Sequence, residues 1–192
     1  MRSSRWQRTT AETSIRIELD LDGPASAKTD TGIGFFDHML AQLGTHGGMQ
    51  LHLACDGDLE VDGHHTVEDC GIVIGQALAQ ALGNRSGIRR YATMFIPMDE
   101  TLAVTHLDIS GRPFFVFRGT IPKVRLGAFD AELCEEFFRA VAMNAGLTLH
   151  MEILYGANVH HMVEALFKSF AHALRQAAEL TGRGVLSSKG ML

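Results

Sequence analysis

The sequence predicts an α+β fold built from two copies of one unit, because segments of the first half recur in the second half in the same order. ETSIRIELDLDG at residues 12–23 aligns without gaps with ETLAVTHLDISG at residues 100–111. Further along, GGMQLHL at residues 47–53 resembles AGLTLHM at residues 145–151. A fixed order of matching blocks indicates an internal repeat.

A third pair of segments, HHTVED at residues 64–69 and HHMVEA at residues 160–165, follows the same order. We therefore interpret residues 1–90 as one α+β repeat and residues 91–192 as a second one. No low-complexity linker separates them. We expect the two repeats to pack together as a single functional body.

The strands of each repeat are predicted by alternating apolar and polar residues. Ile15, Ile17, Leu19 and Leu21 alternate with polar side chains, which is the period of a strand with one buried face. The segments MQLHLAC, LAVTHLDI, FFVF and LTLHMEIL predict further strands.

The helices are predicted by apolar residues at helical spacing in four longer segments. These segments are FFDHMLAQLGTH, HHTVEDCGIVIGQALAQAL, DAELCEEFFRAVAMNAG and HHMVEALFKSFAHALRQAAEL. Asp130 is the expected N-cap of the third helix. Each repeat then reads strands, helix, strands, helix, which predicts a two-layer unit with helices on one face of a sheet.

Composition excludes several classes of protein. The chain is 46% hydrophobic and 20% charged, as in ordinary globular proteins, and its net charge of −5 offers no basic surface for nucleic acid. No apolar run approaches the roughly 20 residues of a membrane span, and no apolar segment after the N-terminus resembles a secretory signal. Three scattered cysteines without a CxxC motif favour reduced thiols in the cytoplasm.

The repeated HHxxE motif predicts metal ligation. On a helix, His64 and Glu68 share a face while His65 points about 100° away, so one turn can serve two metal ions. His160, His161 and Glu164 repeat this arrangement in the second half. A single HHxxE could equally be a helix cap or a surface feature. Its recurrence at the start of the second helix of each repeat favours a metal centre.

The register of the repeat adds one ligand from the first helix of each half. It places His38 of FDHML opposite Glu136 of CEEFF, with the adjacent Glu135 as an alternative. Imidazole and carboxylate ligands without thiolates favour Mn²⁺, with Fe²⁺, Co²⁺ and Zn²⁺ as competitors. His46 could line the same pocket, two turns after His38. For the other histidines we expect core positions on strands for His52 and His150 and assign no role to His106 and His172.

These motifs resemble the imidazoleglycerol-phosphate dehydratase family of histidine biosynthesis. The resemblance runs from RTTAETSI through GFFDHMLAQLGTHG, DGHHTVED, LDISGRP and VHHMVEALFKSFAHALRQA to SSKGML. It implies a ribosomal protein S5 domain 2-like fold, a metal-dependent hydro-lyase activity, two Mn²⁺ per active site and a homo-oligomeric 24-subunit shell with sites between neighbouring subunits. By the same resemblance, one metal takes His38, His65, His160 and Glu164, and the other takes His64, Glu68, Glu136 and His161. Some family members carry His where this sequence has Glu136.

The resemblance also assigns substrate contacts for a small phosphorylated imidazole. Arginine supplies a planar fork for phosphate oxygens, while lysine and serine add a point charge and hydroxyl donors. Gln42 and His46 are further candidates beside the metal. The family's substrate-binding positions correspond here to Arg90, Arg112, Lys168, Ser187, Ser188 and Lys189.

Glu12 is the expected base that takes a proton from a substrate carbon during dehydration to imidazole acetol phosphate. The alternative is a surface charge at the edge of a strand. Two other classes of function stay open from the sequence: a dinuclear metal-dependent phosphoester hydrolase and a metal-storage shell without turnover.

Overall fold

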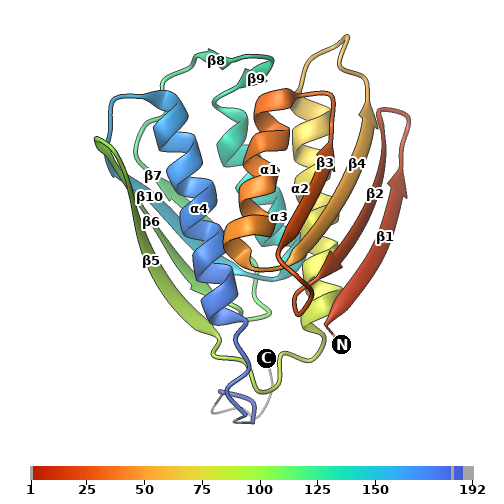
Figure 1. Ribbon diagram of the computed structural model, residues 1–192, viewed down its shortest axis with the longest axis vertical. Helices are drawn as coiled ribbons and strands as arrows, with labels where there is room; N and C mark the ends of the chain where they lie inside the picture. The colour runs from red at the N-terminus through yellow and green to blue at the C-terminus, as the bar shows by residue number, and fades with distance from the viewer. Residues whose placement is uncertain (1, 183, 188–192) are drawn as a thin grey trace.

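The computed structural model describes residues 2–182 and 184–187, whose helices and sheets form three layers. Four helices lie between two four-stranded sheets, one sheet from each half of the chain (Figure 1). The predicted α+β class is confirmed, and each half is a sheet with helices on one face. Among the described residues, no helix is both long enough and apolar enough to cross a membrane.

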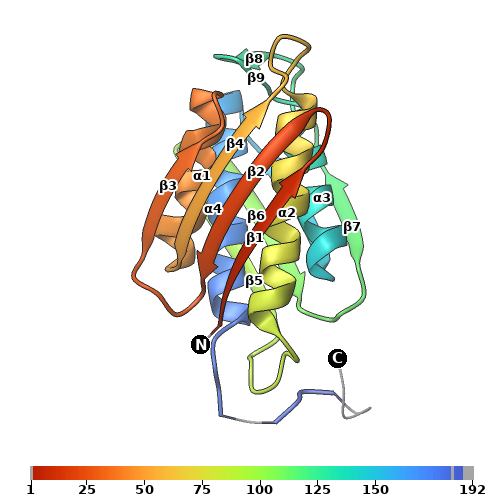
Figure 2. The same cartoon turned by 90° about the vertical axis from the view of Figure 1, so that its right-hand side faces the viewer.

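The first half forms a sheet in the order β1-β2-β4-β3, which faces the viewer in Figure 2. Helix α1 connects the parallel strands β3 and β4, and α2 follows β4. The elements are β1 (Ser3–Thr9), β2 (Thr13–Asp20), β3 (Ser26–Asp30), α1 (Gly34–Gly47), β4 (Gln50–Gly57) and α2 (His64–Leu82).

The second half repeats this topology in the order β5-β6-β10-β7, with α3 connecting the parallel strands β7 and β10. It differs by a short two-stranded hairpin, β8 and β9, inserted before α3. The elements are β5 (Tyr91–Met98), β6 (Thr101–Asp108), β7 (Phe114–Arg118), β8 (Arg125–Leu126), β9 (Phe129–Asp130), α3 (Leu133–Ala145), β10 (Thr148–Tyr155) and α4 (Val159–Ala177).

Strand β2 shows how alternation positions the sheets. Ile15, Ile17 and Leu19 are buried against the helices, and the polar residues between them face outward. The same alternation corrects the expectation for two histidines. His52 is partly exposed and His150 is exposed, because both point away from the helix layer while their strand neighbours are buried.

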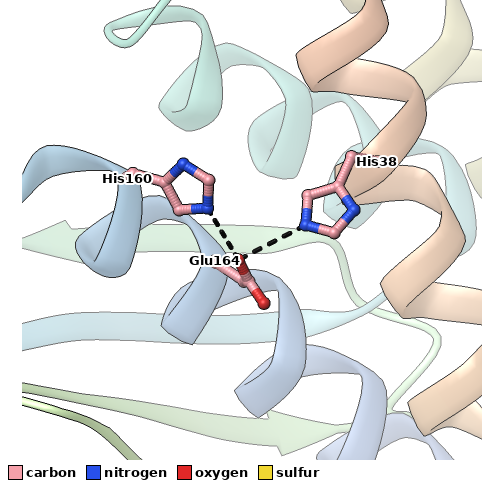
Figure 3. Close-up of side chains that lie close together, drawn as sticks. All are labelled: His38, His160 and Glu164. Carbon is pink, nitrogen blue, oxygen red and sulfur yellow. Dashed lines mark hydrogen bonds and ion pairs between the residues drawn. The ribbon is translucent and has the colours of Figure 1, made fainter.

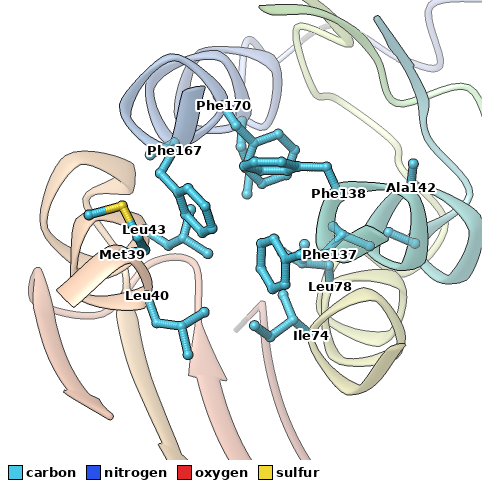
Figure 4. Packing of buried hydrophobic residues seen from close by; sticks show 14 of the residues in the cluster. Met39, Leu40, Leu43, Ile74, Leu78, Phe137, Phe138, Ala142, Phe167 and Phe170 are labelled. Carbon is cyan, nitrogen blue, oxygen red and sulfur yellow. The ribbon is translucent and has the colours of Figure 1, made fainter. Parts of the chain in front are cut away.

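The two halves are joined through their helices, which pack across the halves: α1 lies against α4, and α2 against α3. Gly71 and Gly75 of α2 permit a close approach of α3, because a Cβ at either position would lie within 2.8 Å of α3 atoms. Phe137 of α3 stacks on Phe167 of α4, with ring centroids 5.1 Å apart (Figure 4). The two halves therefore share one hydrophobic core.

The helix starts agree with prediction at α2 and differ at α3. Helix α2 spans residues 64–82 as predicted. The expectation that Asp130 caps α3 is wrong, because Asp130 belongs to β9 and binds Arg125, and α3 begins after Glu132 without a side-chain cap. Helix α4 has a conventional N-cap, in which the Asn158 side chain accepts a hydrogen bond from the His160 backbone N–H.

Candidate metal centre

One cluster of potential metal ligands lies between α1 and α4. His38 comes from α1, and His160 and Glu164 come from successive turns of α4 (Figure 3). Glu164 Oε2 lies 2.9 Å from His160 Nε2 and 3.4 Å from His38 Nε2. Their ligand atoms all lie within 4.8 Å of one another, the only such group of three in residues 2–182 and 184–187. The cluster thus joins the first half of the chain to the second.

Glu164 is charged in this environment although it is almost fully buried. Burial disfavours its ionised form, but hydrogen bonds from Lys168 and His160 outweigh this effect and lower its pKa. Lys168 Nζ lies 2.7 Å from Glu164 Oε1, one helical turn away. The cluster therefore offers a carboxylate and two imidazoles, a donor set that suits divalent transition metals.

A second group of predicted ligands lies between α2 and α3, again joining the two halves. His64 Nε2 is 3.6 Å from Glu68 Oε2, and both side chains are about half exposed. His64 also lines a cavity of about 400 Å³ together with Glu135 and Glu136 of α3. Arg139 contacts both glutamates, at 2.7 Å and 3.5 Å respectively. Glu136 and its alternative Glu135 thus both line the same cavity as His64.

The remaining predicted ligands, His65 and His161, do not join either group within the chain. His65 Nδ1 lies 3.0 Å from Asp58, and its Nε2 lies 3.7 Å from Glu12. The hydrogen bond with Asp58 raises the pKa of His65. His161 Nδ1 lies 2.8 Å from Glu100. Hydrogen bonds from the Asn158 backbone and from His161 hold the pKa of Glu100 far below its usual range.

The predicted substrate contacts divide into two groups. Near the metal cluster, Gln42 Nε2 lies 3.4 Å from His38 Nε2. His46 lies further along the same face of α1, where its ring is 5.2 Å from that of His172. Burial, and then the charges of His172 and Lys168, lower the pKa of His46. These residues form a polar stripe between α1 and α4.

The other group lies at the opposite end of α4. The Arg90 backbone N–H donates to the carbonyl of Ala177, the last residue of α4. The Arg90 guanidinium makes two bonds to Asp108, the shorter of 2.7 Å, and one of 2.5 Å to the Leu186 carbonyl. Arg112 lies 3.9 Å from Asp108. Ser187 follows Leu186 in the chain, while Ser188 and Lys189 lie outside the described residues.

Comparison with known proteins decides the family. A sequence profile described as imidazoleglycerol-phosphate dehydratase matches residues 31–174, about three quarters of the chain. The chain belongs to the imidazoleglycerol-phosphate dehydratase family. A relative of that name from Clostridium kluyveri is 52% identical over 100% of both chains, and one from Alkaliphilus metalliredigens is 54% identical over 100% of this chain and 99% of its own.

Solved structures of this family have the same fold. The chain superposes on the dehydratase of Staphylococcus aureus with a TM-score of 0.85 and 44% identity, covering 93% of this chain and 99% of that one. For the enzyme of Pyrococcus furiosus the TM-score is 0.85 at 34% identity, covering 97% and 100%. The dehydratases of this family are metal-dependent hydro-lyases of histidine biosynthesis, and the His38, His160 and Glu164 cluster supplies ligands of the required kind.

Two carboxylates that contact predicted ligands, Asp58 beside His65 and Glu100 beside His161, escaped the sequence analysis. Glu100 occupies the position that aligns with Glu12 in the repeat, so the alignment contained a signal for it. Asp58 lies in the irregular segment between β4 and α2, where no periodicity or repeat marks it. Its proximity to His65 depends on the path of that segment in three dimensions.

Proposed function

We propose that the chain dehydrates imidazole glycerol phosphate to imidazole acetol phosphate at a dinuclear Mn²⁺ centre. The observation that carries this proposal is the cluster of His38, His160 and Glu164, joined across the two halves of the chain. The first metal would be held by these three residues and by His65. The second would be held by His64, Glu68, Glu136 and His161.

A distance along α4 supports active sites shared between chains. Glu164 lies 13 residues before Ala177, whose carbonyl binds Arg90, so the two ends of the helix are separated by about 20 Å at a rise of 1.5 Å per residue. A molecule of one imidazole ring, a three-carbon chain and a phosphate is shorter than this. The metal end of one chain would therefore act with the basic end of another, in the homo-oligomeric 24-subunit shell expected for the family.

Bound divalent metals would act as Lewis acids that favour the deprotonated form of the substrate imidazole. Gln42 and His46 of the polar stripe, with Lys168 beside Glu164, would contact the phosphorylated substrate from one chain. The neighbouring chain would contact it through Arg90, Arg112 and Ser187. In the single chain, Asp108 contacts both arginines. Opposing cations and donors would hold the substrate carbons in one orientation.

Glu12 is the proposed base for carbon deprotonation. Its Oε1 lies 3.7 Å from His65 Nε2, so a substrate bound at the metal of His65 would reach this carboxylate. The electron-rich deprotonated imidazole would first expel the substrate hydroxyl, which leaves as water with the proton released from the ring. Glu12 would then accept a proton from the adjacent carbon and return it as the resulting enol converts to the ketone. We place the reaction in the cytoplasm, in keeping with three buried thiols, Cys55, Cys70 and Cys134.

A single assay tests this function. Metal-free protein is supplied with Mn²⁺ and imidazole glycerol phosphate, and both ketone and inorganic phosphate are measured. Ketone formation that requires metal, without phosphate release, is the expected result. Phosphate release would instead identify a phosphoester hydrolase, and metal binding without either product would identify a storage protein.

A further inference from the structure

We propose that Asp58 and Glu100 are positioning residues, which hold His65 and His161 oriented for metal ions shared with a neighbouring chain. This inference rests on the proposed dinuclear centre. It concerns the two predicted ligands that the single chain leaves apart from the α1–α4 and α2–α3 groups. Both carboxylates lie outside the proposed ligand sets.

Asp58 binds the His65 ring from the side away from Glu12. Its two oxygens lie 3.0 Å and 3.2 Å from His65 Nδ1. A carboxylate accepts hydrogen bonds and cannot donate them when ionised, so the proton of the neutral ring is held on Nδ1. The lone pair of Nε2 is then left available for a metal, as in the carboxylate–histidine–metal arrangement of many metal sites.

Glu100 makes the equivalent contact with His161 and is itself firmly held. Its Oε1 accepts hydrogen bonds from the backbone N–H groups of Ala157 and Asn158, at 3.1 Å and 2.8 Å. Its Oε2 lies 2.8 Å from His161 Nδ1. The turn between β5 and β6 is thereby joined to the first turn of α4, and the orientation of the His161 ring is fixed.

These contacts occur at the two predicted histidine ligands, His65 and His161, that lie outside the His38, His160 and Glu164 cluster and outside the His64–Glu68 pair. Within residues 2–182 and 184–187, His65 and His161 are the only histidines whose Nδ1 is hydrogen-bonded to a carboxylate. At Nε2, His38 and His160 lie 3.4 Å and 2.9 Å from the buried Glu164, whereas the carboxylates facing Nε2 of His65 and His161 are the more exposed Glu12 and Asp99, each at 3.7 Å. A ring that must meet a metal on another chain gains most from being oriented in advance, because less freedom is lost on binding.

The two carboxylates come from different places in the repeat, so inheritance from one ancestral unit does not account for both contacts. Glu100 aligns with Glu12, whereas Asp58 follows β4, and the corresponding segment after β10 contains Gly156 and Ala157. Carboxylates from two non-equivalent positions thus make the same hydrogen bond to Nδ1 of equivalent histidines. This independent recurrence indicates a requirement of the site itself.

The test uses Asp58→Asn and Glu100→Gln in the full chain, with Mn²⁺ alone as the probe. In Glu100→Gln the amide oxygen can keep the two backbone hydrogen bonds, while the amide N–H₂ faces Nδ1 and favours the ring tautomer with its proton on Nε2. Free Mn²⁺ is followed by electron paramagnetic resonance, and particle mass by light scattering. Loss of such a carboxylate weakens metal affinity about 10- to 100-fold. The Mn²⁺ concentration at half-maximal binding, and the Mn²⁺ concentration at half-maximal assembly, should therefore both rise by that factor.

Asp56→Asn is the matched control, because Asp56 is an exposed carboxylate of β4 two residues before Asp58. It should keep the wild-type midpoints, and Asp58→Glu should recover part of the lost affinity. Thermal unfolding of the metal-free variants identifies a purely structural role, which would lower the melting temperature and leave the Mn²⁺ midpoints unchanged.

Midpoints within about twofold of wild type in both variants would overturn the inference. Absence of Mn²⁺ binding by wild-type protein would overturn the dinuclear centre, and this inference with it.

Discussion

The two groups of predicted ligands occupy equivalent places in the repeat. In one group the carboxylate is buried and paired, and in the other it is half exposed. Between α1 and α4, Glu164 is almost buried, and both of its oxygens have partners. Between α2 and α3, the Glu68 side chain is 46% exposed and lies 3.6 Å from His64 Nε2. Equivalent ligand residues therefore do not produce equivalent sites.

The difference comes from the residues around each carboxylate. Lys168 stands one turn after Glu164 and neutralises it, while the corresponding position after Glu68 is Ile72. Phe35 adds an aromatic edge against the His160 ring, with centroids 5.1 Å apart. The buried pair of Glu164 and Lys168 preserves the ionised carboxylate without metal, so a metal entering this group must compete with Lys168 for Glu164.

The turns that precede β2 and β6 show the same divergence. Glu12 and Glu100 align in the repeat, but Glu100 is held by two backbone N–H groups and His161, whereas Glu12 lies 3.7 Å from His65 with its side chain about half exposed. Glu100 is suited to fixing a ring. Glu12 keeps an accessible carboxylate, as its proposed role as a base requires.

The largest expected effect concerns Glu12, the accessible member of the Glu12 and Glu100 pair. Glu12→Gln should lower turnover at saturating Mn²⁺ at least about a hundredfold, since acid–base catalysis typically contributes that much. Its Mn²⁺ content should match wild type, because Glu12 is not a proposed ligand. Steady-state kinetics with metal analysis of the same sample checks both. Near-normal turnover would remove Glu12 from the mechanism and leave it as a surface charge.

A smaller effect distinguishes the two ligand groups in the metal-free protein. Glu164→Gln should reduce the free energy of unfolding by about 2 kcal/mol at neutral pH, the usual range for hydrogen bonds to charged groups. Glu68→Gln should change it by less than about 0.5 kcal/mol, because exposed pairs contribute little. Urea unfolding in the presence of a chelator measures the difference. Equal losses in the two variants would contradict the asymmetry.

The pH dependence of the Glu164 contribution follows from its lowered pKa. A carboxyl whose folded pKa lies below its unfolded value of about 4.5 stabilises the fold above that value, and the contribution is lost as pH falls through the folded pKa. The gap between wild type and Glu164→Gln should therefore be constant near neutrality and shrink below about pH 4.5. A gap that grows on acidification would show the opposite sign of shift.

The smallest effect concerns the starts of α4 and α3, which carry ligands of the two groups. Asn158→Ala should destabilise the protein by about 1 kcal/mol through loss of the α4 cap. Asp130→Ala should cost less than about 0.5 kcal/mol, because Asp130 caps no helix and its partner Arg125 is largely exposed. Thermal unfolding of both variants is the measurement. A larger loss for Asp130→Ala would show that the hairpin before α3 matters more than the cap.

The fold was predictable from sequence wherever side chains follow a regular period, and less so where polar residues occupy inward positions. Helix α2 was predicted to its observed ends, since apolar residues recur at helical spacing throughout it. Strand β1 was not singled out, because two of its inward positions are the polar residues Ser4 and Arg8. They are accommodated by bonds to the Ala77 carbonyl and to Asp69 of α2.

The sequence by itself determined the repeat, the family and the types of predicted ligand, because these depend on residue identity and on spacing within one helix. Only the tertiary structure decided that α1 pairs with α4 and α2 with α3, and that His38 lies close to His160 and Glu164. It also decided that His65 and His161 stand apart beside Asp58 and Glu100. The physical reason is that such contacts join residues far apart in the chain, and their distances are set by the packing of helices across a shared core.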